Sequence, residues 1–144
     1  MRMVMELINC APQYWDFVRR IRNDNVGFVE QVQITYEQQK LYMEKHDHEY
    51  KICLVHPAPS RLLLSLPAGF IGEVDNDIRF GVDKKFRNKG VGTFMLNNFP
   101  ISIESVGRVK KDPPNIPSSR LFVACGWTQQ PSDDPEFIVY KNEK

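Results

Sequence analysis

Apolar residues recur along the chain with two different spacings, one typical of strands and the other typical of helices. Short apolar runs that are bounded by turn residues predict strands. These runs lie at Met3 to Ile8, Tyr50 to Val55, Gly69 to Val74 and Ile78 to Val82, within Ile103 to Lys110, and at Phe137 to Tyr140. Because Asp75-Asn76-Asp77 is a turn signal, we expect the runs on either side of it to form a hairpin. The pattern leaves open whether Leu62 to Leu66 is an extra strand or a packed loop.

The helical spacing is clearest after Pro12, a residue suited to the first position of a helix. An amphipathic helix is predicted there by apolar residues at i, i+3, i+4 and i+7, namely Tyr14, Phe17, Val18 and Ile21. Thr35 and Gln38 form a capping-box pattern, which predicts a second helix through about Lys45.

Two more helices are predicted in the second half of the chain. One runs from Thr93 to Phe99 and is ended by Pro100. The other spans about Ser118 to Cys125, and Gly126 is placed for a left-handed cap after it. Strands that alternate with helices, with one central hairpin, indicate an α/β or α+β sheet of mixed direction.

Length and charge narrow the class of protein. The 144 residues suit one domain, 1–144. No apolar run approaches the roughly 20 residues that span a bilayer, and the start of the chain lacks the features of a signal peptide, so a cytoplasmic protein with no membrane partner is expected. Nineteen basic against eighteen acidic residues disfavour a broad nucleic-acid surface, unless Lys84 to Lys111 forms a local basic patch.

The sequence contains little that indicates a metal site. Cys10, Cys53 and Cys125 are an odd number with no C-x-x-C pair, so neither a Cys-based zinc site nor a disulfide framework is indicated. The potential ligands in His46-Asp47-His48-Glu49 point to different faces of a helix, so this run is interpreted as a polar helix end. No metal is therefore expected.

The chemistry is concentrated where a strand leads through a basic loop and a Gly-x-Gly into a helix. Unpaired N–H groups at a helix start, with the positive end of the helix dipole, form a site for a phosphate or pyrophosphate. The loop adds four basic side chains, although a solvated basic loop is an equally open interpretation: Lys84, Lys85, Arg87 and Lys89. A Walker loop is excluded because Lys89 precedes Gly90, and a Rossmann fingerprint because Met95 stands where a small residue is needed.

Arg87-Asn88-Lys89-Gly90-Val91-Gly92 resembles the R/Q-x-x-G-x-G/A signature of the GNAT superfamily, the acyl-CoA-dependent N-acetyltransferases. The preceding Ile78 to Asp83 resembles the fourth strand of that family. Asn115 to Trp127 is similar to its late N-x-x-S-x-x-L-Y-x-x-x-G-F motif. The resemblance implies a GNAT-like mixed, mostly antiparallel central sheet flanked by helices.

The resemblance also implies acetyl-CoA as co-substrate and direct transfer of its acetyl group to a primary amine of a small molecule. The N–H groups from Arg87 to Gly92 would hold the pyrophosphate, and the main chain around Phe80 to Val82 would pair with the pantetheine arm. The implied coenzyme contacts are Phe80, Gly81, Val82, Arg87, Asn88, Lys89, Gly90, Val91, Gly92, Thr93, Asn115, Ser118 and Phe122.

For catalysis, the resemblance implies that the Val82 N–H stabilises the oxyanion. The position of the general base falls at Asn76, next to Asp77 and with Glu73 on the adjoining strand; turn formation explains these polar residues equally well. Phe122 stands where relatives often carry a tyrosine that protonates the leaving thiolate. A phenyl ring cannot donate a proton, which leaves a group such as Tyr140, or water.

Within the superfamily, Arg19 to Asp24 followed by Ile34 to Gln39 is similar to the subgroup that acetylates nucleotide-linked amino sugars. The resemblance also implies a homodimer, because dimers are common in the family. The alternative function is a non-catalytic module that retains the fold and binds CoA or a partner without turnover, and it is motivated by Phe122 and by the open question of the base.

Overall fold

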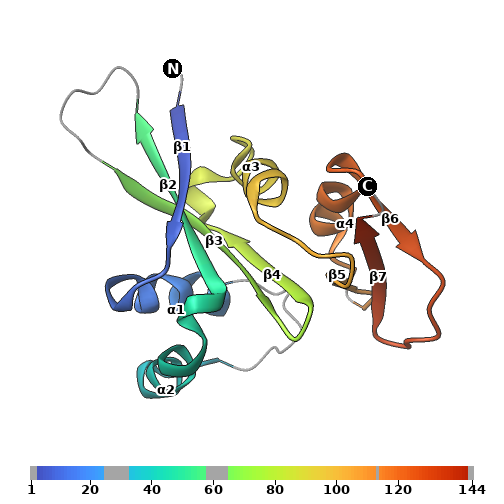
Figure 1. Cartoon of the computed structure of the whole chain (residues 1–144), viewed down its shortest axis with the longest axis horizontal. Helices are drawn as coiled ribbons and strands as arrows, with labels where there is room; N and C mark the ends of the chain where they lie inside the picture. Colours follow the sequence, from blue (N-terminus) through green and yellow to red (C-terminus); the bar gives the residue numbers. More distant parts are fainter. Residues whose placement is uncertain (1–2, 25–32, 58–64, 113, 143–144) are drawn as a thin grey trace.

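A seven-stranded sheet organises the part of the chain that the computed structural model describes, which is residues 3–24, 33–57, 65–112 and 114–142 (Figure 1). The strand order is β1-β2-β3-β4-β5-β7-β6, and every neighbouring pair is antiparallel except the parallel pair β4 and β5. The strands are β1 (Met3–Asn9), β2 (Tyr50–Pro57), β3 (Leu66–Val74), β4 (Asp77–Val82), β5 (Val106–Lys110), β6 (Trp127–Gln130) and β7 (Phe137–Asn142). The predicted mixed, mostly antiparallel sheet is confirmed.

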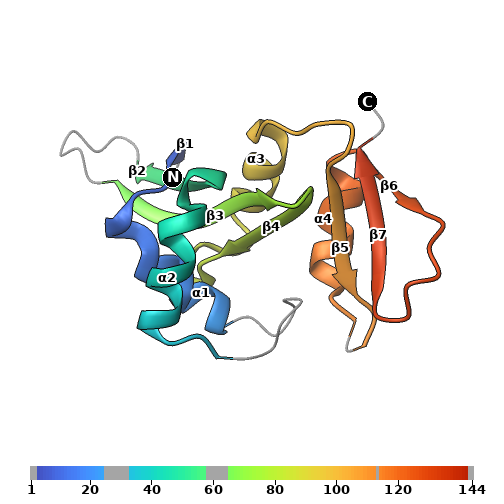
Figure 2. The same cartoon turned by 60° about the horizontal axis from the view of Figure 1, so that its bottom comes forward.

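Helices cover both faces of this sheet (Figure 2). On one face, α1 (Trp15–Asp24) lies over β3 and β4, and α2 (Tyr36–His46) packs against α1. On the other face, α3 (Val91–Asn98) packs on β1, β3 and β4, and α4 (Ile116–Ala124) packs on β5 and β6. The sheet therefore has two hydrophobic cores, one under each helical layer.

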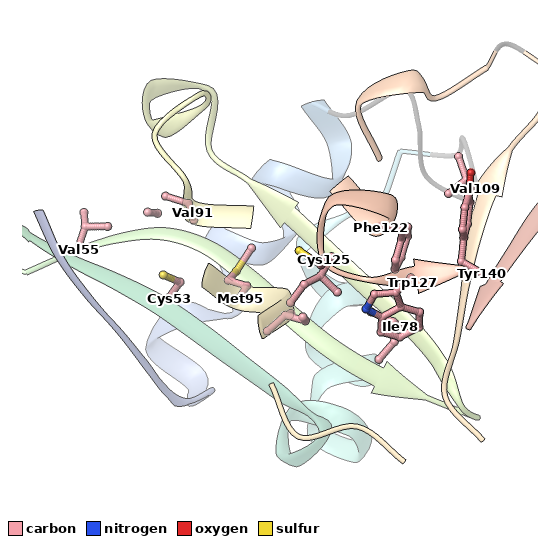
Figure 3. Close-up of a cluster of buried hydrophobic side chains, with 13 residues drawn as sticks. Cys53, Val55, Ile78, Val91, Met95, Val109, Phe122, Cys125, Trp127 and Tyr140 are labelled. Atoms are coloured by element: carbon pink, nitrogen blue, oxygen red, sulfur yellow. The ribbon is translucent and has the colours of Figure 1, made fainter. Parts of the chain in front are cut away.

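The larger core lies under α3 and α4, and its buried side chains include Met95, Phe122, Trp127 and Tyr140 (Figure 3). The second core forms where Phe17, Val18 and Ile21 of α1 meet the α1/α2 face of the sheet, as their spacing predicts. Burying a large apolar side chain contributes about 1.5–3 kcal/mol to folding, so these two clusters hold the helices to the sheet.

Local signals in the sequence also fix the ends of several elements. The predicted capping box is present: Gln38 N–H donates to Thr35 Oγ1 at 3.2 Å, and Thr35 N–H donates to Gln38 Oε1 at 2.9 Å. Asp75 and Asn76 have φ angles of 52° and 66°, which is the left-handed pair that a tight hairpin between β3 and β4 requires. Gly126, with φ 88°, ends α4 as expected.

The structure differs from the sequence-based predictions at two helix starts and in one strand, and the helix predicted from about Ser118 begins at Ile116. The helix predicted from Thr93 begins at Val91. The short strand β6 was not predicted, because its four residues are mostly polar and exposed. The proposed strand or loop at Leu62 to Leu66 lies largely outside the described residues, since β3 begins at Leu66.

Candidate functional site

The parallel strands β4 and β5 separate almost as soon as they meet. They are paired at two positions, Asp77 with Val106 and Ile78 with Gly107. Beyond these, β4 stays paired with β3 up to Val82, and β5 stays paired with β7 up to Lys110. The edge of β4 from Arg79 to Val82 thus has no strand partner on that side in the described part of the chain, and we call this region the β4–β5 opening (Figure 2).

Two residues of β4 direct their backbone groups into the opening. Val106 N–H donates to the Asn76 carbonyl at 2.7 Å, which places the even-numbered residues of this strand on the β5 side. On the other side, Asp83 N–H donates to the Ala68 carbonyl at 2.8 Å, which places the odd-numbered residues toward β3. Because backbone direction alternates along a strand, Phe80 and Val82 present unpaired N–H and C=O groups to the opening.

The loop after β4 leads into a helix start that no side chain caps. Asp83 Oδ1 accepts a hydrogen bond from Lys85 N–H at 3.0 Å and fixes a short 3-10 helix at Lys84–Phe86. The first bond of α3 runs from Phe94 N–H to the Gly90 carbonyl at 3.0 Å, and the N-cap Gly90 has no side chain to offer. The N–H groups of the first turn, at Val91, Gly92 and Thr93, therefore point outward at the positive end of the helix.

Positive charge surrounds this helix start. Lys84, Lys85, Arg87 and Lys89 are all exposed in the loop. Arg87 N–H donates to the Lys84 carbonyl at 3.5 Å, so this amide is partly used within the loop. The strand edge, the uncapped helix start and the basic loop form one continuous stretch that can bind a ligand with an extended arm and an anionic end.

Solved structures with this architecture include several N-acetyltransferases. A domain from Methanocaldococcus jannaschii matches with a TM-score of 0.74 at 12% identity, over 96% of this chain and 97% of that chain. A chimera of the spermidine N-acetyltransferase SpeG from Vibrio cholerae and hSSAT matches with a TM-score of 0.66 at 12% identity, over 95% of this chain and 92% of that chain. PaiA N-acetyltransferase from Thermoplasma acidophilum, in complex with coenzyme A, matches with a TM-score of 0.57 at 11% identity, over 96% of this chain and 99% of that chain.

This chain has the GNAT fold. The expectation drawn from the two sequence motifs is thereby confirmed at the level of the fold. No family model matches the chain, and no curated protein is a significant match to it in sequence.

The two glycines of the loop motif have different roles in this GNAT fold. Gly90 has a φ of 85°, and a Cβ there would meet open space, so backbone conformation is what requires glycine. A Cβ on Gly92 would come within 2.8 Å of Leu121 Cδ2. Glycine at this position therefore allows α3 to approach α4, and contact of the Gly92 backbone with a coenzyme stays a prediction.

The late motif lies beside this loop because α3 and α4 are in contact. Ser118 is one turn before Leu121, on the same side of α4. Asn115 is the N-cap of α4, and its Oδ1 accepts a hydrogen bond from Ser118 N–H at 3.3 Å. Contact of Asn115 and Ser118 with a coenzyme stays a prediction.

Three other predicted contacts are placed less favourably for a ligand. Gly81 turns its backbone toward β3, and a Cβ there would lie 2.8 Å from Ile21 Cγ2, so packing of α1 explains this glycine. Thr93 is exposed on the side of α3 that faces β1, where it lines a depression of about 520 Å³. Phe122 is 1% exposed and belongs to the core (Figure 3).

The Phe122 ring closes the base of the β4–β5 opening on the α4 side. It stacks on Tyr140 with ring centroids 5.4 Å apart and meets Phe80 and Trp127 edge-on at 5.6 and 5.1 Å. A Cβ on Gly107 would lie only 2.3 Å from Phe122 Cζ, so the ring is pressed against β5. Phe122 is thus a core residue in the structure, and its contact with a coenzyme stays a prediction.

The predicted proton acceptors are engaged elsewhere. Asp77 is 5% exposed, and its two carboxylate oxygens accept hydrogen bonds from Arg108 Nε and Nη2 at 3.1 and 3.0 Å. Arg79 Nε lies 3.4 Å from the same carboxylate. Both carboxylate oxygens are engaged by guanidinium groups, so the predicted role of Asp77 as a proton acceptor does not fit the structure.

Glu73 and Asn76 also have structural roles. Glu73 is opposite Ile78 in the register, which directs its side chain to the α3/α4 face, and there it accepts a hydrogen bond from Ser105 Oγ. This bond anchors the connection between α3 and β5 to the sheet. Asn76 is a residue of the hairpin turn. None of the three predicted residues, as the structure describes them, presents an unengaged carboxylate to the opening.

Sequence reasoning missed the arginines that hold Asp77. The hydrogen bonds with Asp77 raise the pKa of Arg108. Burial by itself would lower the pKa of Arg79, but Tyr50, Tyr42 and Asp77 together raise it above the ordinary value. Both guanidinium groups are therefore charged at neutral pH.

The described residues contain no group of three or more His, Cys, Asp or Glu side chains arranged to hold a metal ion. None of the helices in those residues has both the length and the apolar character needed to cross a membrane.

Proposed function

We propose that this protein is an N-acetyltransferase that moves an acetyl group from acetyl-CoA directly to a primary amine of a small molecule. The observation that carries the proposal is the β4–β5 opening, where Phe80 and Val82 present unpaired backbone groups on the strand that leads into the uncapped start of α3. An extended ligand with an anionic end suits this arrangement.

The residues present fit coenzyme A. The N–H groups of Val91, Gly92 and Thr93 would hold the pyrophosphate, and the exposed basic side chains of the loop would add to the attraction. The edges of Phe80 and Val82 would pair with the amides of the pantetheine arm. When bound, the coenzyme supplies a thioester whose carbonyl carbon is open to attack by an amine.

The chain itself would supply orientation and stabilisation of charge. The Val82 N–H is directed into the opening, where it can stabilise the oxyanion of the tetrahedral intermediate. The C–N bond forms as the C–S bond breaks; one proton leaves the amine and one reaches the thiolate sulfur. Since Asp77 and Glu73 are engaged, we propose that water takes the proton from the amine.

The finer proposal for the acceptor is a nucleotide-linked amino sugar, on the resemblance of Arg19 to Asp24 and Ile34 to Gln39. The structure joins these two segments: Asn23 Nδ2 donates to the Ile34 carbonyl at 3.0 Å, and Ile34 N–H donates to Asn23 Oδ1 at 2.9 Å. Hydrogen bonds between the end of α1 and the start of α2 thus explain part of the sequence resemblance. The proposal of a nucleotide-linked amino sugar rests on the sequence alone.

The decisive experiment combines binding and turnover. Calorimetric titration with CoA and with acetyl-CoA tests the coenzyme site, and release of free thiol in the presence of a panel of amines tests transfer. We expect binding of both ligands and thiol release with at least one amine. Absence of binding would contradict the proposal as a whole.

The second candidate is a module that binds CoA without turnover. It is favoured by Phe122, which places no hydroxyl group at the base of the opening, and by the engagement of Asp77 and Glu73. Binding of acetyl-CoA without thiol release for any amine of the panel would support this candidate over the enzyme.

A further inference from the structure

Two arginines flank the β4–β5 opening on the face of the sheet that carries α1 and α2. The pairing between β4 and β5 ends at Ile78 and Gly107, and Arg79 and Arg108 are the next residues of the two strands. Gly107 lies against Phe122 under α4, and Ile78 belongs to the core on that same face. Because side chains alternate along a strand, Arg79 and Arg108 point to the opposite face.

Contacts confirm this placement for both arginines. Arg79 Nη1 donates to Tyr42 Oη of α2 at 3.4 Å. Tyr42 Oη is itself 2.8 Å from Tyr50 Oη, so Arg79 contacts a part-buried pair of hydroxyl groups. The Arg108 guanidinium carbon lies 5.0 Å from the centroid of the Phe137 ring, a cation–π contact on β7.

One carboxylate holds the two guanidinium groups side by side. Asp77 Oδ2 is 3.0 Å from Arg108 Nη2 and 3.4 Å from Arg79 Nε. Side chains that are fixed by such contacts lose little further freedom when a ligand binds, which favours tight and specific recognition. The Arg79 and Arg108 side chains nevertheless keep 33% and 31% of their surface exposed.

Asp77, Arg79 and Arg108 form a cluster that carries more positive than negative charge. Asp77 is shared by both arginines, which leaves one guanidinium charge without its own counter-ion. The next acidic neighbour of Arg108 is Asp134, which attracts it at longer range. Asp134 Oδ1 accepts hydrogen bonds from Glu136 N–H at 2.8 Å and Phe137 N–H at 3.1 Å, and in the described part of the chain it forms no ion pair with Arg108.

We propose that Arg79 and Arg108 form an anion subsite that selects acceptor amines bearing a carboxylate or phosphate group; this inference rests on the proposed acetyl transfer. Phe122 and Phe80 close the α4 side of the opening, so an acceptor reaches the thioester from the face where the arginines lie. Guanidinium groups pair with such oxyanions through two parallel N–H donors. The same charge disfavours a polyamine acceptor.

The test uses matched acceptors that differ in one charged group. Turnover is compared for glucosamine 6-phosphate against glucosamine, for alanine against alaninamide, and for spermidine. We expect kcat/KM at least about tenfold higher for the anionic member of one pair than for its neutral partner, with spermidine the poorest acceptor. The pair that responds identifies phosphate or carboxylate as the recognised group.

Substitutions of the two arginines test whether the cluster causes the preference for anionic acceptors. Arg108→Gln is expected to reduce the preference to within about twofold while KM for acetyl-CoA stays unchanged, and Arg79→Gln is expected to act in the same direction. Lys40→Gln is the control, because this basic residue of α2 is exposed and lies outside both the cluster and the segments that resemble the amino-sugar subgroup. Equal or better turnover of the neutral amines or spermidine, or a preference that survives in both variants, would overturn the subsite.

A binding measurement separates this inference from the proposed function. If no amine is acetylated, glucosamine 6-phosphate and glucosamine are titrated calorimetrically into the protein saturated with CoA. Binding of the phosphate compound alone, lost in Arg108→Gln and kept in Lys40→Gln, would support the subsite although transfer had failed. Equal binding of the two, or no binding of either, would overturn it.

Discussion

The ring of Phe122 is pressed against Gly107, so close that a Cβ on Gly107 would lie 2.3 Å from Phe122 Cζ. The para position of the ring therefore points at the main chain of β5 with no space for another atom. A phenol at this position would need to displace either the strand or the helix α4.

We therefore predict that Phe122→Tyr destabilises the protein and does not accelerate transfer. Overpacking of this kind lowers the free energy of unfolding by about 1–3 kcal/mol. Urea denaturation and thiol release measure the two effects. Phe94→Tyr is the control, because Phe94 is half-buried beside the depression between β1 and α3, where a hydroxyl group fits. Faster turnover at unchanged stability would contradict this account of Phe122.

Gly92 is predicted to be a packing glycine. Gly92→Ala should lower the free energy of unfolding by about 1–3 kcal/mol, because its Cβ would press on Leu121 Cδ2. In a Leu121→Ala background the same substitution should be close to neutral, since the opposing atom is gone. A double-mutant cycle by urea denaturation measures this coupling; additive effects would show that the two residues do not interact.

Asp77 is predicted to stabilise the fold. Asp77→Asn leaves two guanidinium groups against a neutral amide, and loss of one member of a buried ion pair lowers the free energy of unfolding by about 3–5 kcal/mol. Partial exposure of both arginines places the expected effect at the lower end of that range. The control is Asp75→Asn in the exposed hairpin turn, for which little change is expected. A folded Asp77→Asn protein of normal stability with abolished turnover would instead restore Asp77 as a catalytic base.

The buried cysteines are predicted to make stability fall at high pH. Burial raises the pKa of Cys53 to about 11 and that of Cys10 to about 12, from 9.0. The folded state thus keeps these protons after the unfolded chain has lost them, so the free energy of unfolding should decrease as pH rises from about 9 through 11. Urea midpoints measured across this range test the effect.

Cys53→Ala supplies the comparison for that pH series. Cys53 has no exposed surface, so alanine will lower stability at all pH values, but the decline above pH 9 should become shallower. An identical slope in the variant and the parent protein would contradict the assignment to Cys53.

Much of the fold follows from local pattern. The apolar stripe of α1, the capping box at Thr35 and the Asp-Asn turn before Asp77 are each contained within a few residues, and all three are present in the structure. Strand β6 could not be predicted in this way, because its mostly polar residues form a strand only through pairing with β7, after the turn at Gly126.

The candidate site was predicted best where it is made of backbone. The direction of Phe80 and Val82 follows from strand alternation, and the uncapped start of α3 follows from Gly90. Side-chain roles depended on contacts across long stretches of sequence. Arg108 meets Asp77 from 31 residues away, and Leu121 explains Gly92 from another helix, so neither contact leaves a local signal.

The two pairings between β4 and β5 make the sheet resemble two smaller sheets, β1 to β4 and β5 to β7, that share a narrow junction. Any molecule that pairs with Phe80 and Val82 would bridge those halves like an additional strand. We therefore expect ligand binding to slow amide hydrogen exchange on both sides of the junction, including in β7, which such a molecule need not touch.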